Sequence, residues 1–331
     1  MSKTSTEPDR HALNGATMGT RWSALFFMDP GFDPAPLQLA LQAAVSEVDQ
    51  QMSSWKSDSD LMRINRAPVG AWIDAPERLL AVLRLGLAIG QASGGAFDVG
   101  LGDAVTAWGF GPDAAAGERI RIALKARRRP SWEMIELGDG RLRKHEAITL
   151  DLNGIAKGYG VDRLAETLME FGITSFLAGI DGEMRAAGLR PDGEPWTIAV
   201  ESPEHDRRAV HSVLALEDAA VATSGDYRHW VDVQGTRLSH TMDPRHGAPL
   251  RASPASVTVV ARCCAEADAW ATALMVLGAE EGAAMAQQRG LDTLFLLRDR
   301  KSGTVKAQTA GALFSQQPEP RPVDPPLYPA S

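Results

Sequence analysis

The sequence predicts an α+β fold, and three observations lead to this class. Apolar residues recur at helical spacing through much of the first half of the chain. From about residue 173 they change to short alternating or continuous apolar runs bounded by turn residues, which is typical of strands. Helices and strands are therefore mixed without the regular β-α-β alternation of a doubly wound parallel sheet.

The first half of the chain begins with a strand and two long helices. The apolar run at 18–28 predicts the strand. A helix is expected over 36–55, because apolar residues recur every three or four positions and Pro36 suits a first turn. A second helix is expected over 75–98, with Pro76 at its start and a glycine pair at its end. This helix is apolar almost all round, which predicts that it is buried.

The middle of the chain predicts shorter elements. Residues 111–130 read as a connector and a short helix, and the basic run at 127–129 is expected on a solvated face. The glycine-rich stretch at 148–164 is expected to contain the end of a strand, a tight turn and the start of a further helix, which ends at Gly172. The expected strands and the last helix then follow at 175–181, 195–203, 212–225, 229–240, 255–262, 267–278 (the helix) and 291–299.

The domain organisation follows from length and composition. The 331 residues are enough for one large domain or two ordinary ones. We predict a flexible segment at 1–15, a single domain over 16–314, and a disordered tail at 315–331, where six prolines occur in 17 residues.

Charge and cysteine content exclude several classes of function. The net charge of −8 argues against nucleic-acid binding, which depends on basic surfaces. Cys263 and Cys264 are adjacent, so neither a disulfide framework nor a CxxC metal site is expected. The N-terminal residues have no apolar run of the signal-peptide type, so no signal peptide, lipid-attachment cysteine or membrane anchor is expected. The expected location is cytoplasmic for the chain as given, and periplasmic if an export signal has been removed.

The stretch ITLDLNGIAKGYGVDRL, at 148–164, is a candidate ligand-binding turn. Its three glycines allow a ligand to approach the main chain, and Lys157 suggests that this ligand is anionic. Asp151 lies in the same turn. The stretch is not a Walker phosphate loop, because its spacing is wrong and glycine follows the lysine.

A second candidate is the pair Asp268 and Thr272, four residues apart in a predicted helix. This spacing places the carboxylate and the hydroxyl on one face. Oxygen ligands of this kind suit a hard cation such as Mg²⁺. The alternative is a satisfied polar pair at a helix end.

Two polar turns are weaker candidates. Thr223 and Ser224 stand at a strand end, where hydroxyls and backbone N–H groups can bind an anion, although an ordinary turn is the alternative. His240 and Asp243 precede a proline turn. A histidine in a cleft can act as an acid or base, but a lone histidine can equally have a structural hydrogen-bonding role.

Three aromatic residues are candidates for stacking on a flat ring. Trp108 and Phe110 stand among glycines in the stretch 93–112, and Trp55 stands in a polar segment. The alternative for the first two is an aromatic anchor of the core.

Taken in order, these stretches resemble the ApbE family of flavin transferases. The resemblance covers about residues 16–299 and rests on seven blocks: MGT, MSSW with SDLMRIN, GGAFDVG with WGFG, DLNGIAKGYGVD, ATSGDYRHW, RLSHTMDPRHG and ADAWATALMVLG. It implies a two-lobed α+β fold with mixed or antiparallel sheets flanked by helices, and an FAD cleft between the lobes. It also implies Mg²⁺-dependent transfer of FMN from FAD to a threonine of an acceptor flavoprotein, with release of AMP.

The resemblance also assigns roles to individual residues. The positions that match FAD-contacting ones are Met18, Trp55, Trp108, Gly109, Phe110, Asp151 and Lys157. The metal site matches the Gly154 carbonyl, Asp268 and Thr272, and His240 matches the histidine that assists transfer. Asp243 in the same loop is a second catalytic candidate, and Thr223 and Ser224 are expected to contact FAD.

The loop HTMDPRHG departs from the family pattern at Thr241 and His246, which leaves its local contacts open. Two other functions share the same residues. One is a Mg²⁺-dependent FAD pyrophosphatase, in which water replaces the threonine hydroxyl. The other is a flavin-binding carrier without catalysis, which would have no need of the metal pair.

Overall fold

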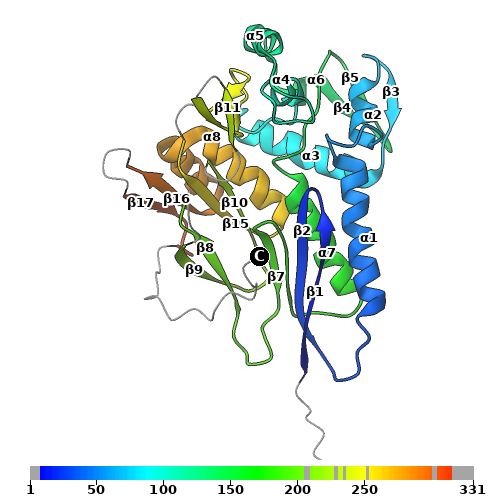
Figure 1. Cartoon of the computed structure of the whole chain (residues 1–331), viewed down its shortest axis with the longest axis vertical. Coiled ribbons are helices and arrows are strands. Elements are labelled where there is room, and N and C mark those ends of the chain that lie inside the picture. The colour runs from blue at the N-terminus through cyan, green and yellow to red at the C-terminus, as the bar shows by residue number, and fades with distance from the viewer. Residues whose placement is uncertain are drawn as a thin grey trace, which may run out of the picture.

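The computed structural model describes residues 8–204, 209–226, 230–233, 236–250, 253–299 and 304–314. An eight-stranded sheet forms its centre, in the order β1-β2-β6-β7-β10-β15-β16-β17 (Figure 1). Neighbouring strands of this sheet pair antiparallel throughout, in agreement with the predicted α+β class. The strands are β1 (Asp9–Thr17), β2 (Thr20–Met28), β6 (Phe176–Ile180), β7 (Glu183–Ala187), β10 (Ala220–Gly225), β15 (Ser256–Ala261), β16 (Asp292–Arg298) and β17 (Val305–Ala310).

Three long helices pack against one face of the sheet, and a hairpin covers the other. The helices are α1 (Ala35–Met52), α7 (Ala156–Glu170) and α8 (Cys264–Arg289), and the hairpin is β8 (Trp196–Glu201) with β9 (Val210–Leu216). Successive side chains of β2 point to opposite faces of the sheet and pack into different clusters. Trp22 and Phe26 are fully buried with the residues of α1 and α7, whereas Phe27 packs into the cluster beneath β8 and β9.

The remaining elements form a smaller part of the molecule, drawn at the top of Figure 1. They are α2 (Asp60–Arg66), β3 (Trp72–Asp74), α3 (Glu77–Ala92), α4 (Gly102–Ala107), α5 (Gly117–Lys125), α6 (Ser131–Met134), β4 (Ile135–Leu137) and β5 (Arg141–Lys144). Strands β3, β5 and β4 pair into a small antiparallel sheet. Two short hairpins, β11 (Trp230–Val233) with β12 (Thr236–Ser239) and β13 (Met242–Asp243) with β14 (Ala248–Pro249), complete the described elements.

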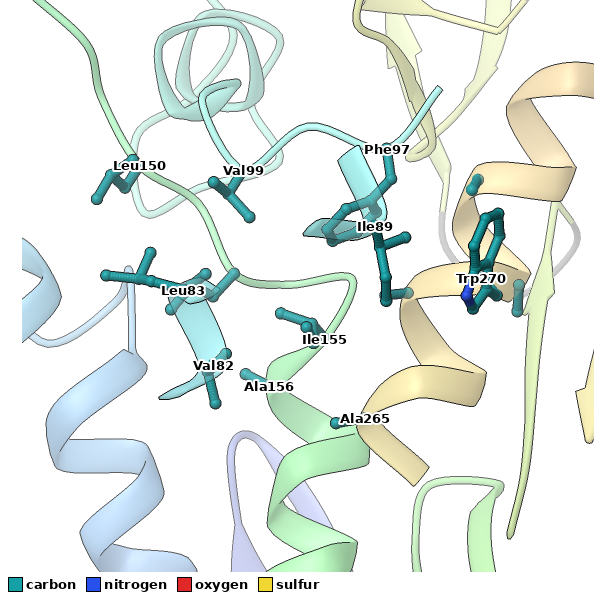
Figure 2. Packing of buried hydrophobic residues seen from close by; sticks show 14 of the residues in the cluster. Val82, Leu83, Ile89, Phe97, Val99, Leu150, Ile155, Ala156, Ala265 and Trp270 are labelled. Atoms are coloured by element: carbon teal, nitrogen blue, oxygen red, sulfur yellow. The ribbon is translucent and has the colours of Figure 1, made fainter. Parts of the chain in front are cut away.

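One hydrophobic core joins the smaller part to the sheet. Figure 2 shows Leu83 and Ile89 of α3 beside Ile155 at the start of α7, with Trp270 of α8 next to them. These side chains belong to one buried cluster, which continues into β15 and β16. The two parts therefore share a core, and a cavity between them has rigid walls.

The beginning of the chain differs from the prediction of a flexible segment at 1–15. Residues Asp9–Thr17 form β1, which pairs along its whole length with β2. The strand lies at the edge of the sheet and is exposed or half-buried until Thr17, so its sequence lacks the apolar signal of a buried strand. Residues 1–7 and the predicted tail at 315–331 lie outside the described residues.

Helix α8 is longer than the predicted helix at 267–278. It runs from Cys264 to Arg289, and Gly278 interrupts it with φ 77° and ψ −179°. The glycine therefore kinks the helix at the place where the sequence predicts its end. No helix in the described part of the chain has the length and apolarity to span a membrane.

Candidate active site

A cavity of about 1180 Å³ lies between the sheet and the smaller part of the molecule. This volume suits a ligand of dinucleotide size. The predicted site residues that line it are Met18, Trp55, Gly109, Phe110, Asp151, Gly154, Lys157, Thr223, Ser224, His240, Asp268 and Thr272. Trp108 and Asp243 are the two predicted residues that do not line it. Segments more than 200 residues apart in the sequence therefore meet at one place.

Two hairpin tips form one wall of the cavity. Met18 and Gly19 connect β1 to β2, and Asp181 and Gly182 connect β6 to β7. All four residues have positive φ, which is the geometry of the two-residue hairpin turn that follows the twist of a sheet. Positive φ is strained for Met18 and Asp181, and such strain is common at functional sites. Because β2 pairs with β6, both tips lie at the same end of the sheet.

The glycine-rich stretch forms the turn that leads into α7. Asp151 accepts hydrogen bonds from the backbone N–H of Asn153 at 3.0 Å and from its side chain at 2.9 Å. Burial raises the pKa of Asp151 to about 6, although the Asn153 N–H opposes this shift. Asp151 therefore lies in the predicted turn, and it lines the cavity.

Lys157, in the first turn of α7, is held by the tip of the β6–β7 hairpin. Its ammonium lies 2.8 Å from Glu183 Oε1 and 3.4 Å from Asp181 Oδ2. Burial lowers the pKa of Lys157, but the negative charges of Glu183 and Asp268 outweigh it, so the pKa is raised. Lys157 is therefore a fixed positive charge, and two of its three donors are already directed at carboxylates.

Glu183 is a site residue that the sequence reasoning missed. Its side chain is buried, and its second oxygen, Oε2, is also buried and has no hydrogen-bond partner. Burial raises the pKa of Glu183 to about 7, against the attraction of Lys157. The Asp-Gly pair between two apolar runs was a usable signal, because this dipeptide is typical of a hairpin turn. Such a turn places Glu183 directly across from Ile180.

Asp268, Thr272 and Gly154, the predicted metal ligands, all line the same cavity. Asp268 is only 5% exposed, and its Oδ2 accepts a hydrogen bond from Gly158 N–H at 3.1 Å. A Cβ added to Gly154 would lie 3.1 Å from Thr272 Oγ1, so the backbone at 154 passes close to that hydroxyl. Burial raises the pKa of Asp268 to about 6, although the charge of Lys157 opposes the shift. Carboxylate, hydroxyl and carbonyl oxygens form a donor set that fits Mg²⁺.

Thr223 and Ser224, at the end of β10, have different partners. The Ser224 hydroxyl lies 3.2 Å from Thr272 Oγ1, which joins it to the proposed metal ligands. The Thr223 hydroxyl lies 2.8 Å from that of Thr258 on β15. Both residues line the cavity, and Ser224 is in direct contact with Thr272.

The two candidate stacking tryptophans have different surroundings. Trp55 lines the cavity and is 61% exposed, so its ring is available at the rim. Trp108 does not line the cavity, and its indole N–H donates to the carbonyl oxygen of Gly247 at 2.9 Å. Trp108 thus anchors the loop that carries His240, while its neighbour Phe110 borders the cavity. Of the three predicted stacking residues, Trp55 and Phe110 line the cavity.

Asp243 lies in the loop from His240 to Gly247, and its side chain binds other residues of that loop. Its carboxylate accepts hydrogen bonds from the backbone and guanidinium of Arg245, and Oδ2 lies 2.9 Å from His246 Nδ1. Burial alone would raise the pKa of Asp243, but these hydrogen bonds lower it. Asp243 therefore shapes the turn and is badly suited to accept a proton. His240 lines the cavity and keeps its candidate role.

One member of the basic run expected on a solvated face is half-buried. Arg128 forms a two-point ion pair with Asp103 of α4, with distances of 3.1 and 3.0 Å. Its guanidinium would clash with any side chain at position 247. Arg128 therefore packs against the same loop residue, Gly247, to which Trp108 donates.

Comparisons with known proteins are consistent with this geometry. Residues 18–295 match the ApbE family. The FAD:protein FMN transferase of Vibrio cholerae is 37% identical over 290 residues, covering 86% of this chain and 87% of that protein. The Escherichia coli K12 protein of the same name is 32% identical over 310 residues, covering 88% of this chain and 85% of that protein.

Solved structures show the same fold. The flavin transferase ApbE from Vibrio cholerae has a TM-score of 0.81 at 32% identity, and the match covers 93% of this chain and 99% of that one. The apo form of Pseudomonas stutzeri flavinyl transferase ApbE also has a TM-score of 0.81, at 34% identity. The match covers 94% of this chain and 96% of that one.

Proposed function

This chain belongs to the ApbE family, and we propose that it transfers FMN from FAD to a threonine hydroxyl of an acceptor flavoprotein, with Mg²⁺ as cofactor and AMP as the leaving product. The observation that carries the proposal is the convergence of the family-matched residues on one cavity of dinucleotide size. The names of the relatives support the transfer from FAD to a protein.

The charge of the cavity supports a metal cofactor. Among the described residues that line it, seven are carboxylates and two are lysines. Lys157 pairs with Glu183 at 2.8 Å, and Lys56 pairs with Asp49 at 2.6 Å. A pyrophosphate would enter an environment of the same sign as itself, which costs free energy unless a cation accompanies it. The oxygen donors of Gly154, Asp268 and Thr272 would hold such a cation.

Bound Mg²⁺ would stabilise the negative charge that develops on the pyrophosphate oxygens. Lys157 would contact the same phosphates through its remaining donor, held in place by the hairpin tip. Trp55 and Phe110 would border the flavin ring. These residues bind and orient FAD, and phosphoryl transfer depends mainly on such positioning and on electrostatics.

The transfer itself exchanges one phosphorus–oxygen bond for another. The threonine oxygen of the acceptor bonds to the FMN phosphorus, and the bond from that phosphorus to the bridging oxygen breaks, so AMP departs with the bridging oxygen. His240, which lines the cavity, would accept the hydroxyl proton. Asp243 is not assigned this role, because its carboxylate is occupied by Arg245 and His246.

The test is to incubate the protein with FAD, Mg²⁺ and an acceptor domain that carries one reactive threonine. We expect a covalent mass increase on that domain equal to FMN less one water, together with AMP. The acceptor's Thr→Val variant is the control and should remain unmodified. AMP and FMN released without modification of the acceptor would indicate an FAD pyrophosphatase, and the absence of AMP under all conditions would indicate a carrier.

A further inference from the structure

We propose that Asp162 is a positioning residue for the metal site, because it docks the first turn of α8 onto α7 and thereby sets where Asp268 and Thr272 point. The inference rests on the metal site proposed above. Asp162 lies on α7, one turn after Gly158, and does not line the cavity. It therefore acts through α8 and not on a ligand.

Both carboxylate oxygens of Asp162 bind the start of α8. Oδ1 accepts a hydrogen bond from Cys264 N–H and Oδ2 accepts one from Ala265 N–H, each at 2.9 Å. These are the first two N–H groups of the helix, which have no partner within it. The residue before the helix, Cys263, provides no side-chain cap. The cap of α8 is thus supplied by another helix.

Asp162 is itself fixed in place. It is 5% exposed, and Arg185 of β7 donates to its Oδ1 at 2.7 Å. A buried carboxylate with three donors has one favourable orientation, so the cap determines both the axial position and the rotation of α8.

A second contact one turn away completes the docking. Gly158 N–H donates to Asp268 Oδ2 at 3.1 Å, so each helix binds the other at two points. A Cβ at Gly158 would lie 2.4 Å from the carbonyl oxygen of Cys264, which shows how closely the two backbones approach. Figure 2 shows Ala265 at the start of α8, close to α7. Gly158 has no side chain that could interlock with α8. The hydrogen bonds of Asp162 and Asp268 therefore fix the position of α8 relative to α7.

The consequence concerns the ligands of the ion. Asp268 and Thr272 lie one and two turns after Cys264, near the start of α8. A small rotation or shift of this segment moves the carboxylate and the hydroxyl relative to the Gly154 carbonyl, which belongs to the turn before α7. Mg²⁺ requires near-ideal geometry, so its affinity is sensitive to such a movement. Groups that orient metal ligands commonly contribute tenfold to hundredfold in affinity.

The experiment separates positioning from helix stability. Asp162→Asn keeps the size of the side chain but loses its charge and one acceptor oxygen. Asp162→Asn combined with Cys263→Ser adds a serine at the N-cap position, whose extended backbone suits a capping side chain. The double variant should recover thermal stability, because α8 is capped again, but not the docking to α7.

The measurement is calorimetric titration of Mg²⁺ into each protein with saturating AMP, which avoids turnover. We expect Mg²⁺ to bind about tenfold more weakly to Asp162→Asn and equally weakly to the double variant. Thr167→Val, which removes another buried hydrogen bond of α7, is the control and should bind Mg²⁺ like the original protein. Recovery of Mg²⁺ affinity together with stability in the double variant would show a merely structural role and overturn the inference.

A milder variant keeps the inference testable if the Asp162 variants do not fold. Arg185→Met removes one donor from Asp162 and leaves the cap in place, so Mg²⁺ affinity should fall by about threefold. Unchanged Mg²⁺ affinity in Arg185→Met would then overturn the inference. If the original protein itself binds no Mg²⁺ in this titration, the proposed metal site is wrong, which is a different result from unchanged affinity in the variants.

Discussion

The ammonium of Lys157 lies 2.8 Å from Glu183 Oε1, and this contact joins the first turn of α7 to the tip of the β6–β7 hairpin. Both side chains line the cavity, and Oε2 of Glu183 has no hydrogen-bond partner. The pair therefore makes the lysine a rigid part of the wall. It also leaves a buried carboxylate that depends on one ammonium for its neutralisation.

Replacing Lys157 by methionine should weaken FAD binding by roughly tenfold to a hundredfold, because a charge–phosphate contact contributes about 1 to 3 kcal/mol. The remaining affinity should depend less on salt. Fluorescence titration of FAD at low and high salt measures both effects. Lys56→Met is the matched control, since Lys56 also lines the cavity but pairs with Asp49. Equal affinities for the original protein and Lys157→Met would show that Lys157 serves only to pair with the hairpin tip.

Glu183 should make the ligand-free protein less stable as the pH rises. Its pKa is raised from 4.5 to about 7, so the folded protein keeps a proton that the unfolded chain has already released. Between these values the folded state binds more protons, and the free energy of unfolding falls with increasing pH. The contribution is present below about pH 4.5 and is lost by about pH 7.

Glu183→Gln should remove this dependence, because glutamine does not titrate. The difference in the free energy of unfolding between the original protein and the variant should change by on the order of 1 to 3 kcal/mol between pH 5 and pH 8. Urea denaturation at both pH values measures it. Glu118→Gln on the exposed side of α5 is the control. A difference that stays constant with pH would contradict the raised pKa of Glu183.

Asp268→Ala should reduce Mg²⁺-dependent AMP release from FAD by at least about a hundredfold, because Asp268 is the only charged group assigned to the ion. The fold should persist, since Asp162 still caps α8. Circular dichroism and the melting temperature check the fold, and AMP is quantified by chromatography over a range of Mg²⁺ concentrations. Near-normal release at limiting Mg²⁺ would remove Asp268 from the metal site.

The flavin should be quenched by Trp55 and not by Trp108. Trp55 lines the cavity, whereas Trp108 does not line it and donates its indole N–H to Gly247. Trp55→Leu should therefore leave bound flavin brighter than in the original protein. Trp108→Phe is the matched aromatic substitution and should leave the quenching unchanged while it loosens the loop that carries His240. Equal quenching in Trp55→Leu and the original protein would place another group against the flavin.

The sequence by itself determined the fold class and most of the cavity lining. The blocks around Met18, Asp151, Thr223, His240 and Asp268 each combine a turn or a helix start with polar residues. Local backbone chemistry fixes such features, because glycines, prolines and the spacing along a helix act within a few residues. For this reason the helices α1, α3 and α7 begin close to their predicted positions. The grouping of distant residues into one site came from the resemblance to the ApbE family, and most of these residues line the same cavity.

Only the tertiary structure decided which partner each polar group has. Lys157 lies 26 residues from Glu183 in the sequence, and Trp108 lies 139 residues from Gly247. Asp162 binds the start of α8 about a hundred residues away, which no local pattern indicates. Such contacts depend on which strands and helices become neighbours, and the desolvation that raises the pKa of Glu183 depends on everything packed around it. Local sequence chemistry selects the elements, whereas the packing of distant elements sets the charge, orientation and partners of their side chains.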